Sequence, residues 1–150
     1  MAAQPPPQEH TKGQRRALDV RWLEHLTAGG NPGDGQQLAE LVSFRNGVWD
    51  FNQGRFFDAH ESFERAWRET PYPERLLSLA LSKLGAAFAH AQRGNLTTAT
   101  QIVRDAQRCL APLPPAYAGI DIAQLRNELA PWLASPQPGP TVIHITPVNE

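Results

Sequence analysis

Hydrophobic positions recur at helical spacing over most of the chain. Leu18, Trp22 and Leu26 recur every four residues and predict a short helix over residues 15–26. Four glycines and a proline between residues 27 and 35 predict a loop. A second helix then ends near Gly54, and its apolar positions are Leu38, Leu41, Val42, Val48 and Trp49.

Four further helices follow with short connections. The third covers residues 56–69 and ends before Pro71, because proline disfavours helical geometry in the residue before it. The fourth covers residues 73–93 and is apolar almost all round, which is typical of a central helix. Gly94 ends it and Asn95 caps the fifth helix, which extends to about Leu110. After a loop over residues 112–119, Asp121 caps a last helix that reaches about residue 133 and that Pro131 bends or ends.

These six helices predict an all-α fold, a single antiparallel helical bundle or helical-hairpin array. We expect one helical domain over residues 14–134, with flexible tails on both sides. Residues 1–13 contain three consecutive prolines and predict a disordered tail. Residues 135–150 predict a Pro-rich extended tail, in which Thr141–Ile145 is β-prone. Because the chain contains no other strand candidate, we expect this run on the surface or disordered, with pairing to a partner's sheet edge as the alternative.

Charge and composition exclude several classes of function. The 150 residues contain 14 Lys and Arg against 15 Asp and Glu, without a basic stripe, which argues against nucleic-acid and anionic-membrane binding. The apolar stretch 76–91 is interrupted by Ser78, Ser82, Lys83 and His90, which argues against a membrane span. Residues 1–8 lack an apolar signal core, so export is not indicated. A single cysteine, Cys109, fits a reducing cytoplasm.

His60 is the principal candidate for a functional residue. With about 100° of rotation per helical residue, it falls just inside the edge of an apolar stripe formed by Phe56, Ala59, Phe63, Ala66 and Trp67. Glu64 is one turn further on, close enough to share a hydrogen bond or a cation with His60. Glu61 points elsewhere.

The fourth helix contributes two more ionisable residues. Lys83 and His90 are seven residues apart, so they share a face of this otherwise apolar helix, and burying either without a partner is costly. The third and fourth helices are joined by a short turn and are expected to be antiparallel. A cluster of His60, Glu64, Lys83 and His90 follows from that arrangement.

Three interpretations of the cluster remain open. In the first, His60, Glu64 and His90 bind a divalent metal and Glu61 is the general base, as in H-E-x-x-H sites, although position 64 is Glu rather than the second His of that motif. In the second, Lys83 pairs with Glu64 in a structural polar network. A lysine beside the carboxylate repels a divalent ion, so it favours this second interpretation. In the third, the cluster binds a small ligand.

The ordered combination of short motifs resembles the DUF309 family over about residues 44–133. The residues that carry the resemblance are Gly54-Arg55-Phe56-Phe57-Asp58-Ala59-His60-Glu61, Glu64, Trp67, His90, Gly94-Asn95 and Tyr117-Ala118-Gly119-Ile120-Asp121. The resemblance implies a small all-α protein of unknown function, of a kind sometimes labelled a predicted metal-dependent hydrolase. It also implies signature positions at His60, Glu61, Glu64, Trp67 and His90. The family often has Gln where this chain has Lys83, and the full charge of a lysine there disfavours the hydrolase interpretation.

Other residues indicate packing or partners. Trp67, like Trp22, Trp49 and Trp132, is expected to be a packing residue, with stacking on a ligand as the alternative for Trp67. Cys109 is expected to be a buried, inert thiol. Small and large apolar residues at tetratricopeptide-like spacing around Ala59, Phe63 and Ala66 leave open a helical scaffold that binds a protein partner or a second copy of the chain.

Overall fold

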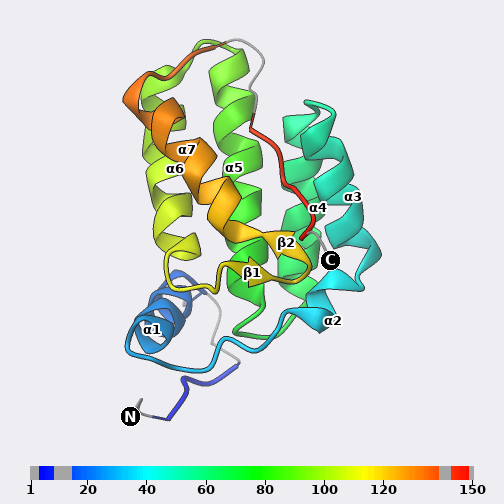
Figure 1. Cartoon of the computed structure of the whole chain (residues 1–150), viewed down its shortest axis with the longest axis vertical. Helices are drawn as coiled ribbons and strands as arrows, with labels where there is room; N and C mark the ends of the chain where they lie inside the picture. Colours follow the sequence, from blue (N-terminus) through cyan, green and yellow to red (C-terminus); the bar gives the residue numbers. More distant parts are fainter. Residues whose placement is uncertain (1–3, 9–14, 139–142, 149–150) are drawn as a thin grey trace.

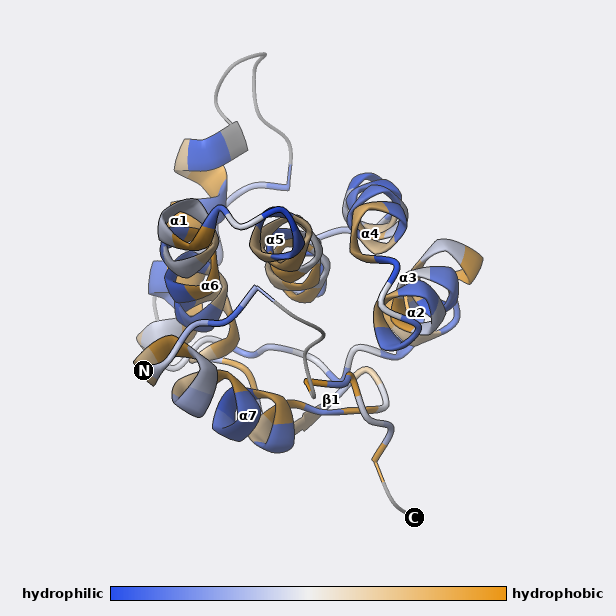
Figure 2. Cartoon of the chain, turned by 90° about the horizontal axis from the view of Figure 1, so that it is seen from above, coloured by the Kyte–Doolittle hydropathy of each residue, from blue (hydrophilic) through white to orange (hydrophobic). Residues whose placement is uncertain are grey.

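Apolar side chains cover α5 (Arg75–Gln92) on nearly every side, and this helix lies at the centre of the molecule. It packs between α4 (Phe56–Glu69) and α6 (Leu96–Leu110), as Figures 1 and 2 show. The remaining helices cover this three-helix layer. Helix α3 (Val42–Asn52) packs on α4, and α7 (Ile122–Ala134) packs on α6. The central position predicted for this helix is therefore confirmed.

This arrangement is seen in a computed structural model that describes residues 4–8, 15–138 and 143–148. The described residues are predominantly helical, which confirms the all-α class. Two further helices, α1 (Arg15–Thr27) and α2 (Gln36–Ala39), complete the helical part, and β1 (Ala116–Tyr117) and β2 (Ile120–Asp121) form one small hairpin. None of the described helices is both long enough and apolar enough to span a membrane.

Most helix boundaries agree with the hydrophobic pattern. Helix α4 begins and ends at the predicted residues, and its buried face is Phe56, Ala59, Phe63 and Ala66. Gly54 and Gly94 follow the ends of α3 and α5 with φ angles of 80° and 86°, a left-handed conformation that glycine adopts without strain. The Asp121 side chain caps α7 by accepting a hydrogen bond from the Gln124 backbone N–H at 2.9 Å. Asn95 stands at the start of α6 but makes no such side-chain bond.

The prediction that the second helix is continuous up to Gly54 is wrong, because the structure divides it into α2 and α3. Leu41 separates them with an extended backbone, φ −72° and ψ 133°. Leu38 and Phe44 are both buried. In one continuous helix their side chains would point about 120° apart. The break allows both to face the core.

The C-terminal run is also placed differently from the prediction. Ile143 and Ile145 are buried rather than on the surface. The Ile145 backbone is held by the Asn52 side chain, which donates to Ile145 O at 2.9 Å and accepts from Ile145 N at 2.8 Å. Further along, Asp121 N donates to Thr146 O and Val148 N donates to Gly119 O. Thr141 and Val142 lie outside the described residues.

The partner of this segment is the hairpin β1–β2, which lies in the stretch predicted as a loop. Ala116 pairs with Asp121 and Tyr117 with Ile120. Ala118 and Gly119 form the turn with φ angles of 53° and 76°, as a two-residue hairpin turn of type I′ requires. The run at residues 143–148 thus finds a sheet edge within its own chain, where Ile120 bridges to Pro147.

Candidate functional site

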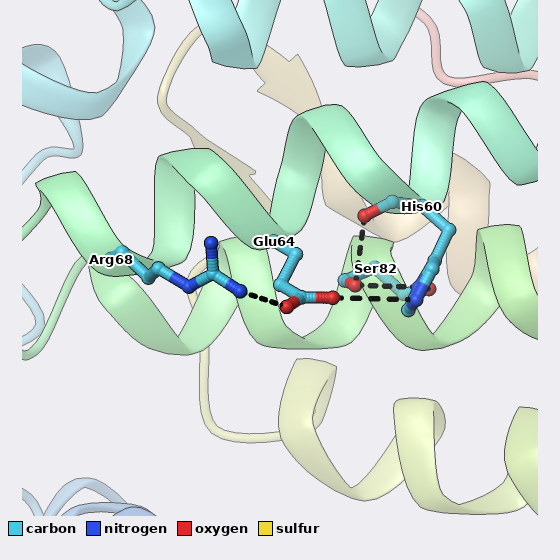
Figure 3. A network of polar contacts seen from close by, with 4 residues as sticks. All are labelled: His60, Glu64, Arg68 and Ser82. Atoms are coloured by element: carbon cyan, nitrogen blue, oxygen red, sulfur yellow. Dashed lines mark hydrogen bonds and ion pairs between the residues drawn. The ribbon is translucent and has the colours of Figure 1, made fainter.

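The His60 side chain is fixed between α4 and α5 by contacts to a serine (Figure 3). Its Nδ1 lies 2.9 Å from the backbone oxygen and 2.9 Å from the Oγ of Ser82. The Ser82 hydroxyl in turn lies 3.2 Å from the His60 carbonyl oxygen, to which it donates. A proton on Nδ1 that is donated to the Ser82 carbonyl satisfies all of these contacts together. The ring is then oriented with Nε2 towards Glu64.

Glu64 is shared between two basic side chains of its own helix. Its Oε2 lies 3.5 Å from His60 Nε2, which makes an ion pair when the ring is protonated, and its Oε1 pairs with Arg68. The predicted pairing of Glu64 with Lys83 is not found. Arg68 is one turn along the same helix, so it reaches the carboxylate without crossing to another element. The His60–Glu64 neighbourhood itself is as predicted.

Lys83 instead has no hydrogen bond or ion pair to any residue in the described part of the chain. It is partly buried and forms part of the wall of two adjoining cavities, together with Trp67 and Leu79. The first cavity, of about 370 Å³, is also lined by His60, Glu64, Ser82, Ala86 and Ile102. The Lys83 side chain is therefore placed where a bound molecule could reach it.

The other expected site residues lie apart from this cavity. His90 follows Ser82 by eight residues, which is about 12 Å along an α-helix. Two residues further on, the Gln92 side chain donates to Gly54 O in the turn before α4, so His90 lies near that end of α4. Its Nδ1 is buried and has no hydrogen-bond partner among the described residues. Glu61 is exposed.

The expected metal ligands are consequently not gathered. Among the residues the structure describes, no group of three or more His, Cys, Asp or Glu side chains is placed to hold a metal ion. His60 and Glu64 are neighbours, but His90 does not join them. Trp67 is half-buried in the wall shared by the two cavities, and its ring lies 5.2 Å from the Arg75 guanidinium carbon.

A second cavity, of about 530 Å³, shares Lys83, Trp67 and Leu79 with the first, and no sequence pattern indicates it. Helix α1 contributes Asp19 to its wall, and α6 contributes Asp105, Arg108 and Cys109. Asp19 accepts a hydrogen bond from the Tyr72 hydroxyl. No sequence signal joins Asp19 to Lys83, because they are on helices separated by much of the chain.

Burial changes the acidity of groups at this second cavity. Desolvation raises the pKa of the Asp19 carboxyl, while the Tyr72 hydrogen bond and the charges of Arg75 and Lys83 oppose that rise. Desolvation also raises the pKa of Cys109 to about 11, so the thiol is protonated near neutral pH. The expectation of a buried, inert thiol agrees with both its burial and this shift.

Comparison with known families gives a match over the middle of the chain. The model of DUF309, a domain of unknown function, matches residues 44–102. The matched range begins in α3 and ends in α6, and it contains His60, Glu64, Trp67, Lys83 and His90. The family resemblance is confirmed over this range, whereas residues 117–121 lie beyond it. No curated protein matches the chain.

Proposed function

We propose that this protein binds a small organic anion whose charged group contacts Lys83. The observation that carries the proposal is the partly buried Lys83 side chain, which lines two cavities and makes no hydrogen bond or ion pair within the described residues. Removing an ammonium from water without a compensating partner costs free energy. An anionic ligand would supply the missing partner.

The carboxylates near Lys83 already have other partners. Glu64 pairs with Arg68 and His60, and Asp105 lies 2.5 Å from Arg108. Asp19 accepts from Tyr72, and burial raises its pKa while the charges of Arg75 and Lys83 oppose that rise from a distance. None of the three comes within 4.0 Å of the lysine, so Lys83 has no direct ion pair and a ligand could supply one.

The shape of the first cavity favours a ligand with an apolar body. Its volume of about 370 Å³ lies in the range usual for small-molecule sites, about 300–1,000 Å³. Leu79, Ala86 and Ile102 supply apolar surface, and the Trp67 ring adds an aromatic edge. His60 and Ser82 lie at the polar end. A compact carboxylate with an aliphatic or aromatic body matches this lining.

The sequence provides a selective test, because Lys12 and Lys83 are its only lysines. Reductive methylation with ¹³C-formaldehyde labels these two amines and the N-terminus, and each gives its own NMR signal. Phenylacetate and octanoate should shift the Lys83 signal and leave that of Lys12 unchanged. The matched neutral probes, 2-phenylethanol and octanol, should bind more weakly. Equal shifts at both lysines would contradict the proposal.

A matched pair of variants tests the charge itself. In unlabelled protein, Lys83→Gln should weaken phenylacetate binding by about tenfold to a hundredfold, since a hydrogen bond to a charged group contributes about 1.5–3 kcal/mol. Arg93→Gln removes an exposed charge from the end of the same helix and should leave affinity unchanged. Titration calorimetry measures both. Wild-type affinity in Lys83→Gln would refute the role of the lysine.

Metal-assisted hydrolysis, with His60, Glu64 and His90 as ligands and Glu61 as base, remains a prediction that the anion-binding proposal does not require. Elemental analysis of protein purified without added metal tests it. Stoichiometric metal that is lost in His60→Ala would support the hydrolase. Sub-stoichiometric metal, unchanged by that substitution, would end the hydrolase prediction.

A cytoplasmic location also belongs to the proposal, supported by the single buried thiol of Cys109.

A further inference from the structure

Two aromatic rings, Trp22 of α1 and Tyr72 just before α5, pack against each other, and neither lines the two cavities at Lys83. The indole of Trp22 stacks on the ring of Tyr72, with centroids 5.3 Å apart and planes inclined by 6°. The Arg75 guanidinium carbon lies 4.7 Å from the centroid of the same tyrosine ring. Both aromatic residues are almost completely buried in the described structure. We call Trp22 and Tyr72 the aromatic pair.

The chain's own proline-rich segment, Pro5-Pro6-Pro7-Gln8, is hydrogen-bonded to the aromatic pair through Pro7 and Gln8. The Trp22 indole Nε1–H donates to the carbonyl oxygen of Pro7 at 3.0 Å. The Gln8 side chain makes two bonds to the Tyr72 backbone, donating through Nε2 to Tyr72 O at 2.9 Å and accepting through Oε1 from Tyr72 N at 2.8 Å. Residues predicted as part of a disordered tail are thus held by three hydrogen bonds.

These contacts have the chemistry of proline-rich recognition. Consecutive prolines favour an extended polyproline II helix, whose carbonyl oxygens are left without internal partners. Aromatic-lined surfaces bind such segments in several unrelated domains, because little conformational entropy is lost on binding. Here the Trp22 indole N–H donates to the carbonyl oxygen of Pro7. The Tyr72 backbone bonds the side-chain amide of Gln8, the next residue.

We infer that the aromatic pair is a binding site for a proline-rich segment of a partner protein, and that Pro5–Gln8 occupies it in cis. The partner segment would carry a side-chain amide directly after its last proline, as Gln8 does. The cis segment is weakly held, since only Pro6 of its residues is even half-buried and the others are exposed. A longer or better-fitting segment can therefore replace it. This inference does not depend on ligand binding at Lys83.

The test uses the full chain and the indole N–H signals of its four tryptophans. Gln8→Ala removes the two bonds to Tyr72 and should move the Trp22 signal, whereas Gln4→Ala, at an exposed residue of the same segment, should not. Trp49, exposed on α3, serves as the internal reference. Because Gln8 is exposed, its substitution leaves the hydrophobic core intact.

A blocked peptide, Gln-Pro-Pro-Pro-Gln, is then added to each protein. It should shift the Trp22 signal of Gln8→Ala back towards its wild-type position. Its apparent Kd for wild type should be about tenfold higher, since the intact cis segment competes at an effective concentration on the order of millimolar. The control peptide Gln-Ala-Ala-Ala-Gln should leave Trp22 unchanged.

Three results would overturn the inference. The first is a Trp22 signal that does not respond to Gln8→Ala, and the second is an equal response to both peptides. The third is a concentration-dependent dimer of Gln8→Ala, detected by light scattering, in which added peptide does not shift Trp22. That result would assign the site to exchange of the N-terminal segment between copies of this chain.

Discussion

Two buried serines on α5, Ser78 and Ser82, differ in their hydrogen bonds. Ser82 contacts His60, whereas the Ser78 hydroxyl has no partner among the described residues. Ser82→Ala should therefore lower the free energy of unfolding by about 1 kcal/mol, the usual net value of one hydrogen bond. Ser78→Ala should leave it unchanged or raise it, because a buried hydroxyl without a partner is itself unfavourable. Urea denaturation at neutral pH measures both, and equal losses would contradict the assignment.

At the residue scale, the sequence predicted contacts within a helix better than contacts between helices. His60 and Glu64 are one turn apart, so periodicity alone brought them together. The sequence does not indicate Ser82 as a partner of His60, because a serine in an apolar helix carries no distinctive signal. Lys83 was recognised as an anomalous charge, but its partner was predicted wrongly, since Arg68 takes the Glu64 carboxylate within α4. Side-chain rotamers decide which basic residue reaches the Glu64 carboxylate, and a helical wheel carries no information on rotamers.

At the scale of elements, Gly85 sets the distance between α4 and α5. A Cβ at this position would lie 2.8 Å from His60 N and 2.9 Å from Phe56 O, both backbone atoms that cannot rotate away. Gly85→Ala gains about 1 kcal/mol of helix propensity. It should nevertheless lower the free energy of unfolding by about 1–3 kcal/mol, because overpacking forces the helices apart. Urea denaturation measures the loss, and the His60 ring resonances should shift with it.

Gly47→Ala is the matched control for that crowding. Its Cβ would meet the Phe63 ring at 2.6 Å, at the packing of α3 against α4 rather than between α4 and α5. It should also reduce stability, while the His60 ring resonances stay unchanged. A Gly85→Ala protein that is more stable than wild type would show that propensity outweighs the close approach.

Elements with strong periodicity were predictable, and those set by distant contacts were not. Helix α4 was predicted to the residue because its apolar stripe, its glycine start and Pro71 all agree. The break at Leu41 follows from burying both Leu38 and Phe44, and a pattern of leucines does not reveal it. The hairpin β1–β2 has strands of two residues each, too short for alternation to be visible.

At the scale of the whole molecule, contacts between the chain's ends and its middle were beyond sequence reasoning. The C-terminal run was recognised as β-prone, yet its partners are the end of α3 and the hairpin edge. The Pro-rich composition near the N-terminus indicated an extended segment, and Pro5–Gln8 contacts Trp22 and Tyr72. Composition indicated the local conformation in both cases. It did not indicate which distant surface the segment would cover.

The contact between α3 and the C-terminal segment can be tested through Asn52. Its amide makes both bonds to the Ile145 backbone across 93 residues of sequence, and so keeps Ile143 and Ile145 against the core. Asn52→Ala should lower the free energy of unfolding by about 1–3 kcal/mol, because it leaves the backbone groups of Ile145 without partners. Asn46→Ala, an exposed asparagine on the same helix, should have little effect.

Hydrogen exchange separates this effect from general destabilisation. In Asn52→Ala, the Ile145 amide should exchange much faster than in wild type, while amides in the middle of α5 should lose protection only by the global change in stability. Unchanged protection at Ile145 would mean that burial of the two isoleucines holds the segment without Asn52. Ile145→Ala would then be the decisive variant, with an expected loss of about 2–5 kcal/mol for a fully buried isoleucine.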